Sequence, residues 1–235
     1  MEELLLESLY RYFVQPQIDT NTNTIIGYEL LMKELTEEGW RLPKSFSAID
    51  PQITADLLIE TTKVLSDKVR RLSVNVSREQ LMTTTISEAI IQSQKQIYPT
   101  KLVVELTEDE SPTKYSNEEV KEKLNYFLDR GMQVSLDDVG TGINHFHNIS
   151  DLLPIASELK FALQNFSKKF IDKSMQQKIH FWHAMSKEYG LRLVVEGVED
   201  KDDHKLIGKL GVNLKQGYYY SKPQLLKLPN DCCLY

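Results

Sequence analysis

The sequence has only two cysteines, and it lacks both a long apolar run and a basic leader. Cys232 and Cys233 are adjacent near the C-terminal end, so they cannot cross-link distant parts of a fold, and we expect a reducing compartment. No apolar stretch reaches the roughly 18 residues that suggest a membrane span. The first residues, MEELLLESLYRYF, have acidic flanks where a signal peptide has basic ones. We therefore expect a cytoplasmic protein without membrane insertion.

The sequence also lacks an excess of positive charge. Its 28 Lys and Arg residues against 34 Asp and Glu residues give a formal net charge of -6. Because a nucleic-acid duplex is bound through clustered Lys and Arg, a duplex is not the expected main partner. A small anionic ligand held through a metal ion is compatible with this charge. The 235 residues, 41% hydrophobic and 26% charged, are enough for one large core or two small ones.

The hydrophobic pattern predicts an antiparallel start followed by alternating helices and strands. Two strand-like runs, 10–18 and 24–33, flank the turn cluster 19–23 and predict a hairpin. Helices are expected at 52–68, 78–96, 117–130, 173–189 and 201–210. Strands are expected at 71–77, 101–106, 132–137, 191–195 and 212–219, with a short segment at 157–160. This alternation indicates parallel strands with crossover helices.

Polar residues end or follow several of these strands. The set comprises Asn75, Glu105, Asp137, Lys160, Glu196 and Gln216. Glu29 adds an acidic residue inside the second strand of the hairpin, where a polar partner is needed. In a (β/α) barrel the chemistry collects at the C-terminal ends of the strands, so acidic side chains there predict a metal site.

Two adjacent carboxylates, Asp137 and Asp138, lie where an apolar strand meets the turn containing Gly140 and Gly142. Neighbouring side chains on a strand point to opposite faces, but the twist at a strand end lets both reach one cation. The alternative is a turn in which the aspartates accept hydrogen bonds from backbone N–H groups. The pattern of the turn by itself leaves both interpretations open.

The candidate ligands are hard oxygen donors, and their kind selects the metal. They are Glu29, Asn75, Glu105, Asp137 and Asp138. Such a set suits Mg²⁺ or Mn²⁺ better than Zn²⁺. One or two such ions favour phosphodiester hydrolysis, in which Lys160 would offset developing charge and Glu196 would take a proton from the attacking water. Two pairs of histidines, at 145 and 147 and at 180 and 183, form a weaker transition-metal alternative because no third ligand is nearby.

Eight short motifs in a fixed order carry a resemblance to a known family. They are Gln15-Pro16, Tyr28-Glu29-Leu30-Leu31, Val74-Asn75-Val76-Ser77, Glu105-Leu106-Thr107-Glu108, Asp137-Asp138-Val139-Gly140-Thr141-Gly142, Leu159-Lys160, Val195-Glu196-Gly197-Val198-Glu199 and Gln216-Gly217-Tyr218-Tyr219. With them the chain resembles an EAL domain, the bacterial family that hydrolyses cyclic di-GMP to linear pGpG.

The resemblance implies an α/β fold, a TIM-like (β/α)8 barrel with an antiparallel first strand, and a single domain over residues 1–235. It implies metal ligation by the five oxygen donors named above, charge stabilisation by Lys160 and water activation by Glu196. Gln15, Lys33 and Gln216 match positions that contact the dinucleotide. Glu108 and Glu199 are expected to orient loops instead of binding metal. The tyrosines 218–220 either stack on a guanine or pack at the barrel rim.

The chain departs from the family pattern at three places. Lys33 stands where the family has arginine, which replaces a bidentate fork by a single ammonium. Ala162 stands where the family has aspartate after Lys160, and 143–146 replaces a loop of the Ser-Ser-Leu type. An alternative function is therefore a weak or inactive EAL protein that acts as a cyclic di-GMP receptor or binds a protein partner. The chain is expected to carry no cyclase, receiver or sensory segment.

The resemblance also implies a homodimer whose contact lies near residues 143–173. This stretch is rich in apolar side chains and poor in charge before Lys168. Its apolar residues are Phe146, Ile149, Leu152, Leu153, Ile155, Phe166, Phe170 and Ile171. The alternative is that they cover the helices of their own barrel.

Overall fold

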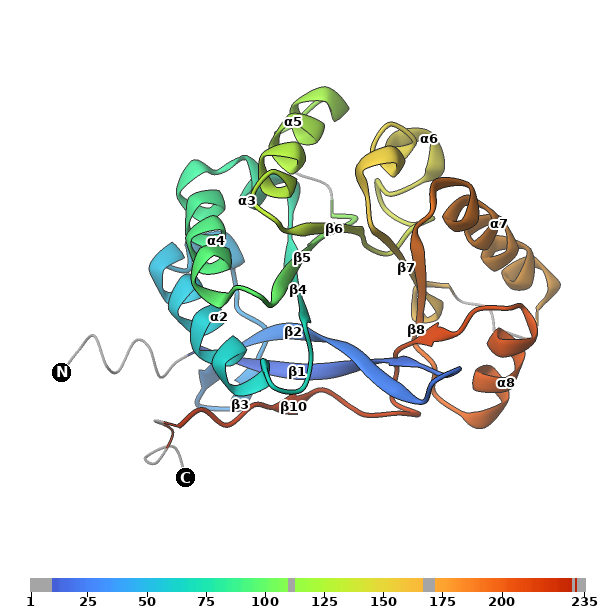
Figure 1. Ribbon diagram of the computed structural model, residues 1–235, viewed down its shortest axis with the longest axis horizontal. Helices are drawn as coiled ribbons and strands as arrows, with labels where there is room; N and C mark the ends of the chain where they lie inside the picture. The colour runs from blue at the N-terminus through green and yellow to red at the C-terminus, as the bar shows by residue number, and fades with distance from the viewer. Residues whose placement is uncertain (1–9, 110–112, 167–171, 230, 232–235) are drawn as a thin grey trace.

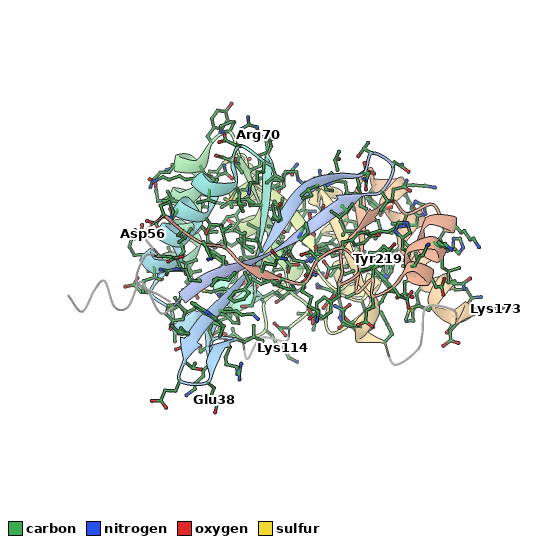
Figure 2. All side chains as sticks on the ribbon, turned by 90° about the horizontal axis from the view of Figure 1, so that it is seen from below. Glu38, Asp56, Arg70, Lys114, Lys173 and Tyr219 are labelled. Atoms are coloured by element: carbon green, nitrogen blue, oxygen red, sulfur yellow. The ribbon has the colours of Figure 1, made fainter. Side chains whose placement is uncertain are left out.

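Strands β1 (Tyr10–Asp19) and β2 (Thr24–Thr36) form the antiparallel hairpin that the sequence predicts. They belong to a computed structural model that describes residues 10–109, 113–166, 172–229 and 231. The second strand is longer than expected because it continues into a further antiparallel partner, β3 (Gly39–Arg41). This β2–β3 hairpin projects from the rest of the molecule, with Glu38 at its tip (Figure 2).

Eight strands close into a barrel (Figure 1). After β2 the parallel strands are β4 (Arg71–Val76), β5 (Lys101–Leu106), β6 (Gln133–Leu136), β7 (Glu158–Ala162), β8 (Arg192–Glu196) and β9 (Leu214–Lys215). The first strand, β1, pairs antiparallel with both β2 and β9 and so closes the ring. The TIM-like barrel with one antiparallel strand is therefore confirmed. Its parallel strands all end at one rim, called here the mouth, and begin at the opposite rim, the base.

Helices surround this ring (Figure 1). They are α2 (Pro51–Leu65), α3 (Arg78–Met82), α4 (Thr84–Ile97), α5 (Asn117–Leu128), α6 (Phe146–Ile149), α7 (Lys173–Tyr189) and α8 (Lys201–Lys209), with 3-10 turns η1 (Phe46–Ala48), η2 (Leu153–Ile155) and η3 (Leu163–Asn165). None of the helices in the described part of the chain combines the length and the apolar character that a membrane crossing requires.

Two expected elements differ from the structure. The single helix expected over 78–96 is two helices, because Thr83 adopts an extended conformation with ψ 111° and its hydroxyl donates to the Glu79 carbonyl, at 2.8 Å. The strand expected over 212–219 is only β9, because the chain turns at Gly217. A Cβ at Gly217 would lie 2.2 Å from the Val198 carbonyl oxygen, so only glycine fits this close approach.

The strands separate an apolar layer from a polar interior, as the alternation in β4 predicts. Leu72, Val74 and Val76 belong to the hydrophobic core between the barrel wall and the helices. Ser73 is buried on the opposite face, and Asn75 lies further along it, exposed at the mouth. The interior face of β4 is therefore polar, and its polar residues lead toward the mouth.

The base of the barrel is closed by an ionic cluster, called here the basal cluster. It consists of Arg71, Gln133, Glu158 and Arg192, which begin four different strands. Glu158 accepts hydrogen bonds from Arg71, at 3.0 Å, and Arg192, at 3.1 Å, through Oε2. The pKa of Glu158 is lowered, because the two guanidinium charges outweigh the opposing effect of burial.

A C-terminal strap runs along β1. Its strand β10 (Gln224–Leu225) pairs antiparallel with Phe13 and Val14. Further on, Asp231 accepts from Arg11 Nη2 at 2.7 Å in a buried ion pair. At the mouth, Gln15 Nε2 donates to the Ser221 carbonyl at 3.0 Å. The two ends of the described chain are thus tied together on one side of the barrel.

Candidate active site

Lys160 lies at the centre of the mouth and is fully buried. It does not end its strand as expected, because β7 continues to Ala162 and so places the ammonium below the rim. Nζ lies 2.7 Å from Glu196 Oε1 and 2.8 Å from Glu105 Oε2. It is also 3.3 Å from Glu29 Oε2 and from Asp137 Oδ1. One cation therefore contacts four carboxylates that come from four parts of the barrel.

Positive charge is in short supply around these carboxylates. Burial, reinforced by the neighbouring carboxylates, raises the pKa of Glu105 and of Glu196 well above the ordinary value, although Lys160 acts in the opposite direction. For Glu29 burial acts in the same direction, but Lys160 and hydrogen bonds from Asn75 and Gln216 lower its pKa. The pKa of Lys160 is itself raised, because its carboxylate partners outweigh burial. The cluster is built to take more positive charge than one ammonium supplies.

A second group of carboxylates lies beside the first. Glu108, Asp137 and Asp138 each place an oxygen within 4.8 Å of those of the other two. Asp138 reaches this position because its backbone is left-handed, with φ 47°, which Asp tolerates better than most residues. Burial, and next the charge of Asp137, raise the pKa of Asp138 to about 7. The turn thus brings both aspartates together, as the strand-end argument requires.

Glu108 was expected to orient a loop, and the structure shows both that contact and a place in the carboxylate group. A Cβ at Gly142 would meet the Glu108 carbonyl oxygen at 2.3 Å, so the loop can pack there only with glycine. Ile143 N–H donates to the same carbonyl at 3.0 Å. The usable signal in the sequence was its position three residues after Glu105, directly past the end of β5.

Amide side chains complete the mouth. Asn75 Nδ2 donates to Glu29 Oε1 at 2.9 Å. Gln216 Nε2 donates to the other oxygen of Glu29 and, at 3.2 Å, to Gln15 Oε1. Both glutamines are buried. Residues predicted from separate motifs as metal-binding and ligand-binding therefore form one hydrogen-bonded set.

A cavity of about 400 Å³ opens beside this set. Its lining includes Gln15, Glu29, Asp137, Asp138, Glu196 and Gln216. Lys33 does not line it, and its ammonium lies 4.5 Å from the centroid of the Phe13 ring. Tyr218 does line it and is largely exposed, whereas the Tyr220 hydroxyl lies 2.7 Å from His204 Nδ1. Of the three tyrosines, Tyr218 is placed to meet a ligand.

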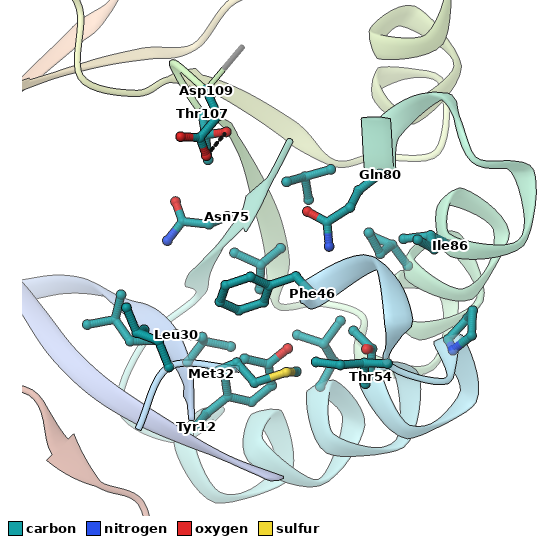
Figure 3. Close-up of a pocket in the computed structure, with 18 residues that line it drawn as sticks. Tyr12, Leu30, Met32, Phe46, Thr54, Asn75, Gln80, Ile86, Thr107 and Asp109 are labelled. Atoms are coloured by element: carbon teal, nitrogen blue, oxygen red, sulfur yellow. Dashed lines mark hydrogen bonds between the residues drawn. The ribbon is translucent and has the colours of Figure 1, made fainter. Parts of the chain in front are cut away.

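Asn75 does not line that cavity but a second one, of about 230 Å³, between the barrel wall and the helices α2 and α4 (Figure 3). This cavity is mostly apolar, with Leu30, Met32 and Phe46 among its lining residues. Thr107 and Asp109 lie at its polar end, joined by a hydrogen bond of 3.3 Å (Figure 3). Three of the carboxylates that contact Lys160, namely Glu29, Asp137 and Glu196, line the 400 Å³ cavity, while Glu105 is buried behind them.

The donors at the mouth fit a hard divalent cation. Glu105 Oε1 is buried and has no hydrogen-bond partner in the described part of the chain, while Oε2 is taken by Lys160. The oxygen-only set of carboxylates and one amide is the kind that Mg²⁺ and Mn²⁺ prefer. The one group of three close metal-ligating side chains found in the described residues is acidic, and no histidine belongs to it.

Several apolar side chains of the stretch proposed for a dimer contact are buried inside their own domain. Ile149, Leu152 and Leu153 are fully buried, which matches the alternative that they cover their own barrel. Phe146 stays 38% exposed and packs edge-on against Phe181, which is 42% exposed. The sequence argument missed Phe181 because it lies on α7. Phe170 and Ile171 fall outside the described residues.

Comparisons with known proteins agree on one family. A family profile described as "EAL domain" matches residues 3–223. "Probable cyclic di-GMP phosphodiesterase PdeB" of Escherichia coli is 24% identical over an alignment of 224 residues that covers 88% of this chain and 41% of PdeB. This chain therefore spans less than half the length of that relative.

Two solved structures show the same fold. "PaMucR Phosphodiesterase, c-di-GMP complex" has a TM-score of 0.78 at 21% identity, with 95% of each chain covered. "Klebsiella pneumoniae BlrP1 pH 8.0 calcium/cy-diGMP complex" has a TM-score of 0.77 at 18% identity and covers 92% of this chain and 56% of that one.

Proposed function

The chain belongs to the EAL domain family, and from that premise we propose that it is a phosphodiesterase that hydrolyses cyclic di-GMP to linear pGpG with Mg²⁺ or Mn²⁺. The observation that carries this proposal is the imbalance of charge at the mouth. Six carboxylates gather around a single buried ammonium: Glu29, Glu105, Glu108, Asp137, Asp138 and Glu196. A binding site for one or two divalent cations accounts for this imbalance, and a purely structural ion cluster does not.

Five residues would hold the ions: Glu29, Asn75, Glu105, Asp137 and Asp138. When bound, the ion supplies Lewis-acid polarisation of the phosphodiester and lowers the pKa of the attacking water. Glu108 lies close enough to Asp137 and Asp138 to join them. The unpartnered Oε1 of Glu105 supports this assignment.

Glu196 and Lys160 would handle the proton and the charge of the reaction. Glu196 lines the cavity, and burial raises the pKa of its carboxyl, which makes it a stronger proton acceptor than a free glutamate. Lys160 keeps its proton because its own pKa is raised, so it stays a fixed positive charge that offsets negative charge on the phosphate oxygens. The 2.7 Å contact between them keeps the Glu196 carboxylate oriented.

Gln15 and Gln216 would orient the dinucleotide. Both line the cavity beside Glu29, so their amides reach a ligand bound at the ions. Lys33 lies outside that lining and would contact a phosphate only after leaving the Phe13 ring. We therefore assign it a weaker share of the binding energy than a bidentate arginine would have.

Turnover of cyclic di-GMP, measured as formation of pGpG by chromatography, tests this proposal. We expect turnover with Mg²⁺ or Mn²⁺, none after chelation, and inhibition by Ca²⁺, whose longer and looser bonds orient the water poorly. The double variant Glu105→Ala, Asp137→Ala should lose calorimetric Mg²⁺ binding. Undiminished Mg²⁺ binding by that variant would contradict the metal site.

A second candidate function is a cyclic di-GMP receptor or protein-binding regulator with weak turnover or none. Ala162 favours it, since this residue lies opposite Glu196 in the β7–β8 register and offers no carboxylate. Binding of cyclic di-GMP without metal-dependent turnover would support the receptor function over the phosphodiesterase function. Restoration of turnover by Ala162→Asp would identify the missing carboxylate as the cause.

We also propose that residues 1–235 form one EAL-type domain, that it works in the cytoplasm, and that it forms a homodimer. The adjacent Cys232 and Cys233 support a reducing compartment. The exposed pair Phe146 and Phe181 supports a contact surface. Sedimentation velocity at micromolar concentration tests the dimer, and a monomer with full activity would contradict it. Phe146→Glu should then produce monomers.

A further inference from the structure

Arg78, the first residue of α3, is a buried cation whose acceptors are all neutral. Only 6% of its surface is exposed. Nη1 donates to the Thr107 carbonyl at 2.8 Å, and Nη2 donates to Asn144 Oδ1 at 3.0 Å. No carboxylate in the described part of the chain lies within ion-pair distance of this guanidinium. Burying a charge without a counter-charge costs stability, so the contacts that Arg78 makes need a reason beyond packing.

Asn144, which accepts from Arg78, holds the Asp137 turn together. Its side chain is fully buried. Nδ2 donates to the Asp137 carbonyl at 2.6 Å and to the Leu106 carbonyl at 3.1 Å. Its own backbone carbonyl accepts from Gly140 at 2.9 Å. One carboxamide therefore joins the end of β5 to the start of the Asp137–Asp138 turn.

The orientation of that carboxamide depends on Arg78. Nδ2 can face the two carbonyls only while Oδ1 faces the opposite way, toward a donor. Arg78 is the side chain that supplies this donor, and its second bond fixes the Thr107 carbonyl, next to Glu108. Arg78 thus contacts both segments that carry the Glu108, Asp137 and Asp138 group, and it lines a separate cavity of about 420 Å³ instead of the one beside Glu29.

We propose that Arg78 is a positioning residue, which sets the geometry of the cation site by orienting Asn144. The inference rests on the proposed function, since it requires that Glu108, Asp137 and Asp138 bind the ion. The same three hydrogen bonds that define the Asn144 side chain define the distance between β5 and the Asp137 turn. Loss of the guanidinium frees the carboxamide to rotate and lets the turn move away from Glu108.

Binding of Mn²⁺, followed by the electron paramagnetic resonance signal of the free ion, tests the inference without relying on turnover. We expect Arg78→Met to weaken Mn²⁺ binding by about 10-fold or more, the lower end of the range for residues that orient metal ligands. Arg78→Lys should give a smaller loss because one donor remains. Arg11→Met is the matched control, since Arg11 is equally buried but pairs with Asp231, and it should destabilise the fold while changing Mn²⁺ affinity by less than about twofold.

A double-variant cycle with Asn144→Ala tests whether Arg78 acts through Asn144. Asn144→Ala alone should weaken Mn²⁺ binding, and adding Arg78→Met or Arg78→Lys should then give little further loss, because coupled residues are not additive. The turnover of Arg78→Met should recover at saturating Mg²⁺, which a general folding defect would not allow. Losses that multiply in the double variant would overturn the inference.

The outcome also separates this inference from the proposed function. Equal Mn²⁺ affinity in Arg78→Met and the unmodified chain would overturn the inference alone. If Arg78→Met does not fold, the Mn²⁺ affinity of Arg78→Lys tests the inference in its place. An affinity of Arg78→Lys equal to that of the unmodified chain would contradict the positioning role of Arg78. An unmodified chain that binds no Mn²⁺ would overturn both.

Discussion

The barrel carries a buried ionic cluster at each end, and the two clusters are balanced in opposite ways. At the base, one carboxylate, Glu158, is shared by Arg71 and Arg192. At the mouth, four carboxylates share the single cation Lys160. The pKa of Glu158 is lowered, whereas the pKa values of Glu105 and Glu196 are raised. Burial is similar at both ends, so the difference lies in the supply of positive charge.

The balance of charge distinguishes the ion cluster at the base from the candidate cation site at the mouth. In the basal cluster two guanidinium groups face one carboxylate, so negative charge is not in excess there, although Glu158 Oε1 has no hydrogen-bond partner among the described residues. The mouth keeps an excess of carboxylates that the protein alone does not neutralise, which is what a cation site requires. A buried ionic cluster therefore indicates a ligand site when its pKa shifts show that charge is missing, and Glu158 supplies the contrasting case within the same barrel.

The largest effect is expected when the mouth loses Glu196, the residue proposed to accept the proton of the attacking water. Glu196→Gln should reduce kcat about 10²-fold or more, the scale of a lost general base, because the amide keeps the shape of the side chain but takes no proton. Dinucleotide binding, measured by calorimetry, should stay close to that of the unmodified chain. A collapse of affinity with kcat unchanged would make Glu196 a binding residue instead.

The matching change at the base should cost stability and leave catalysis alone. Glu158→Gln leaves two arginines without a carboxylate, and the free energy of unfolding should fall by about 3 kcal/mol, the low end for a broken buried ion pair. The low end applies because both guanidiniums keep some contact with solvent. Urea denaturation measures the loss. A lower kcat in the folded variant would show that the two ends are coupled.

Added Mg²⁺ should stabilise the protein through the mouth alone. At a concentration about 100 times Kd, binding adds about 2.7 kcal/mol to the free energy of unfolding. The Glu158→Gln variant should show the same gain as the unmodified chain. Glu105→Gln combined with Asp137→Asn should show none, and thermal melts with and without Mg²⁺ measure all three. An equal gain in the mouth variant would place the ion elsewhere.

The last prediction concerns how the stability of the metal-free protein depends on pH. Asp138, Glu105 and Glu196 have raised pKa values, so the metal-free native state binds more protons than the unfolded chain above about pH 4. The stability of the metal-free protein should therefore fall as pH rises toward 7, and its melting temperature should fall with it. Glu158 acts in the opposite direction, since its stabilisation is lost only as pH falls below its ordinary pKa. Mg²⁺ should abolish the decline, and melts from pH 4 to 7 check it.

The periodicity of the sequence predicts the barrel well because its strands alternate between two clearly different faces. Such alternation places Ser73 and Asn75 on the interior face, where Ser73 lies opposite Glu29 and Asn75 donates to the Glu29 carboxylate. The break at Thr83 was not predictable, because it depends on one extended residue inside a helical pattern. The early end of the last strand was not predictable either. The chain turns at Gly217, where the close approach of the Val198 backbone, distant in the sequence, leaves room only for glycine.

The positions of the candidate site residues were most predictable at strand ends and least predictable for the groups around them. Parallel strands bring their ends to one rim, so Glu105, Asp137 and Glu196 follow from topology. The central position of Lys160 does not, because it depends on β7 extending beyond it. Arg78 and Asn144 carried no local signal, since a buried guanidinium and its carboxamide acceptor are 66 residues apart in the chain.

The ion pair between Arg11 and Asp231 has a consequence for folding during synthesis. These two residues are 220 positions apart, and β1 meets β9 only after nearly the whole sequence exists. During synthesis on the ribosome the growing chain therefore carries an open sheet whose first strand lacks one neighbour. Contacts of such long range fold slowly and leave strand edges free to aggregate. The protein should consequently depend on slow release or on chaperones more than a helical protein of equal length.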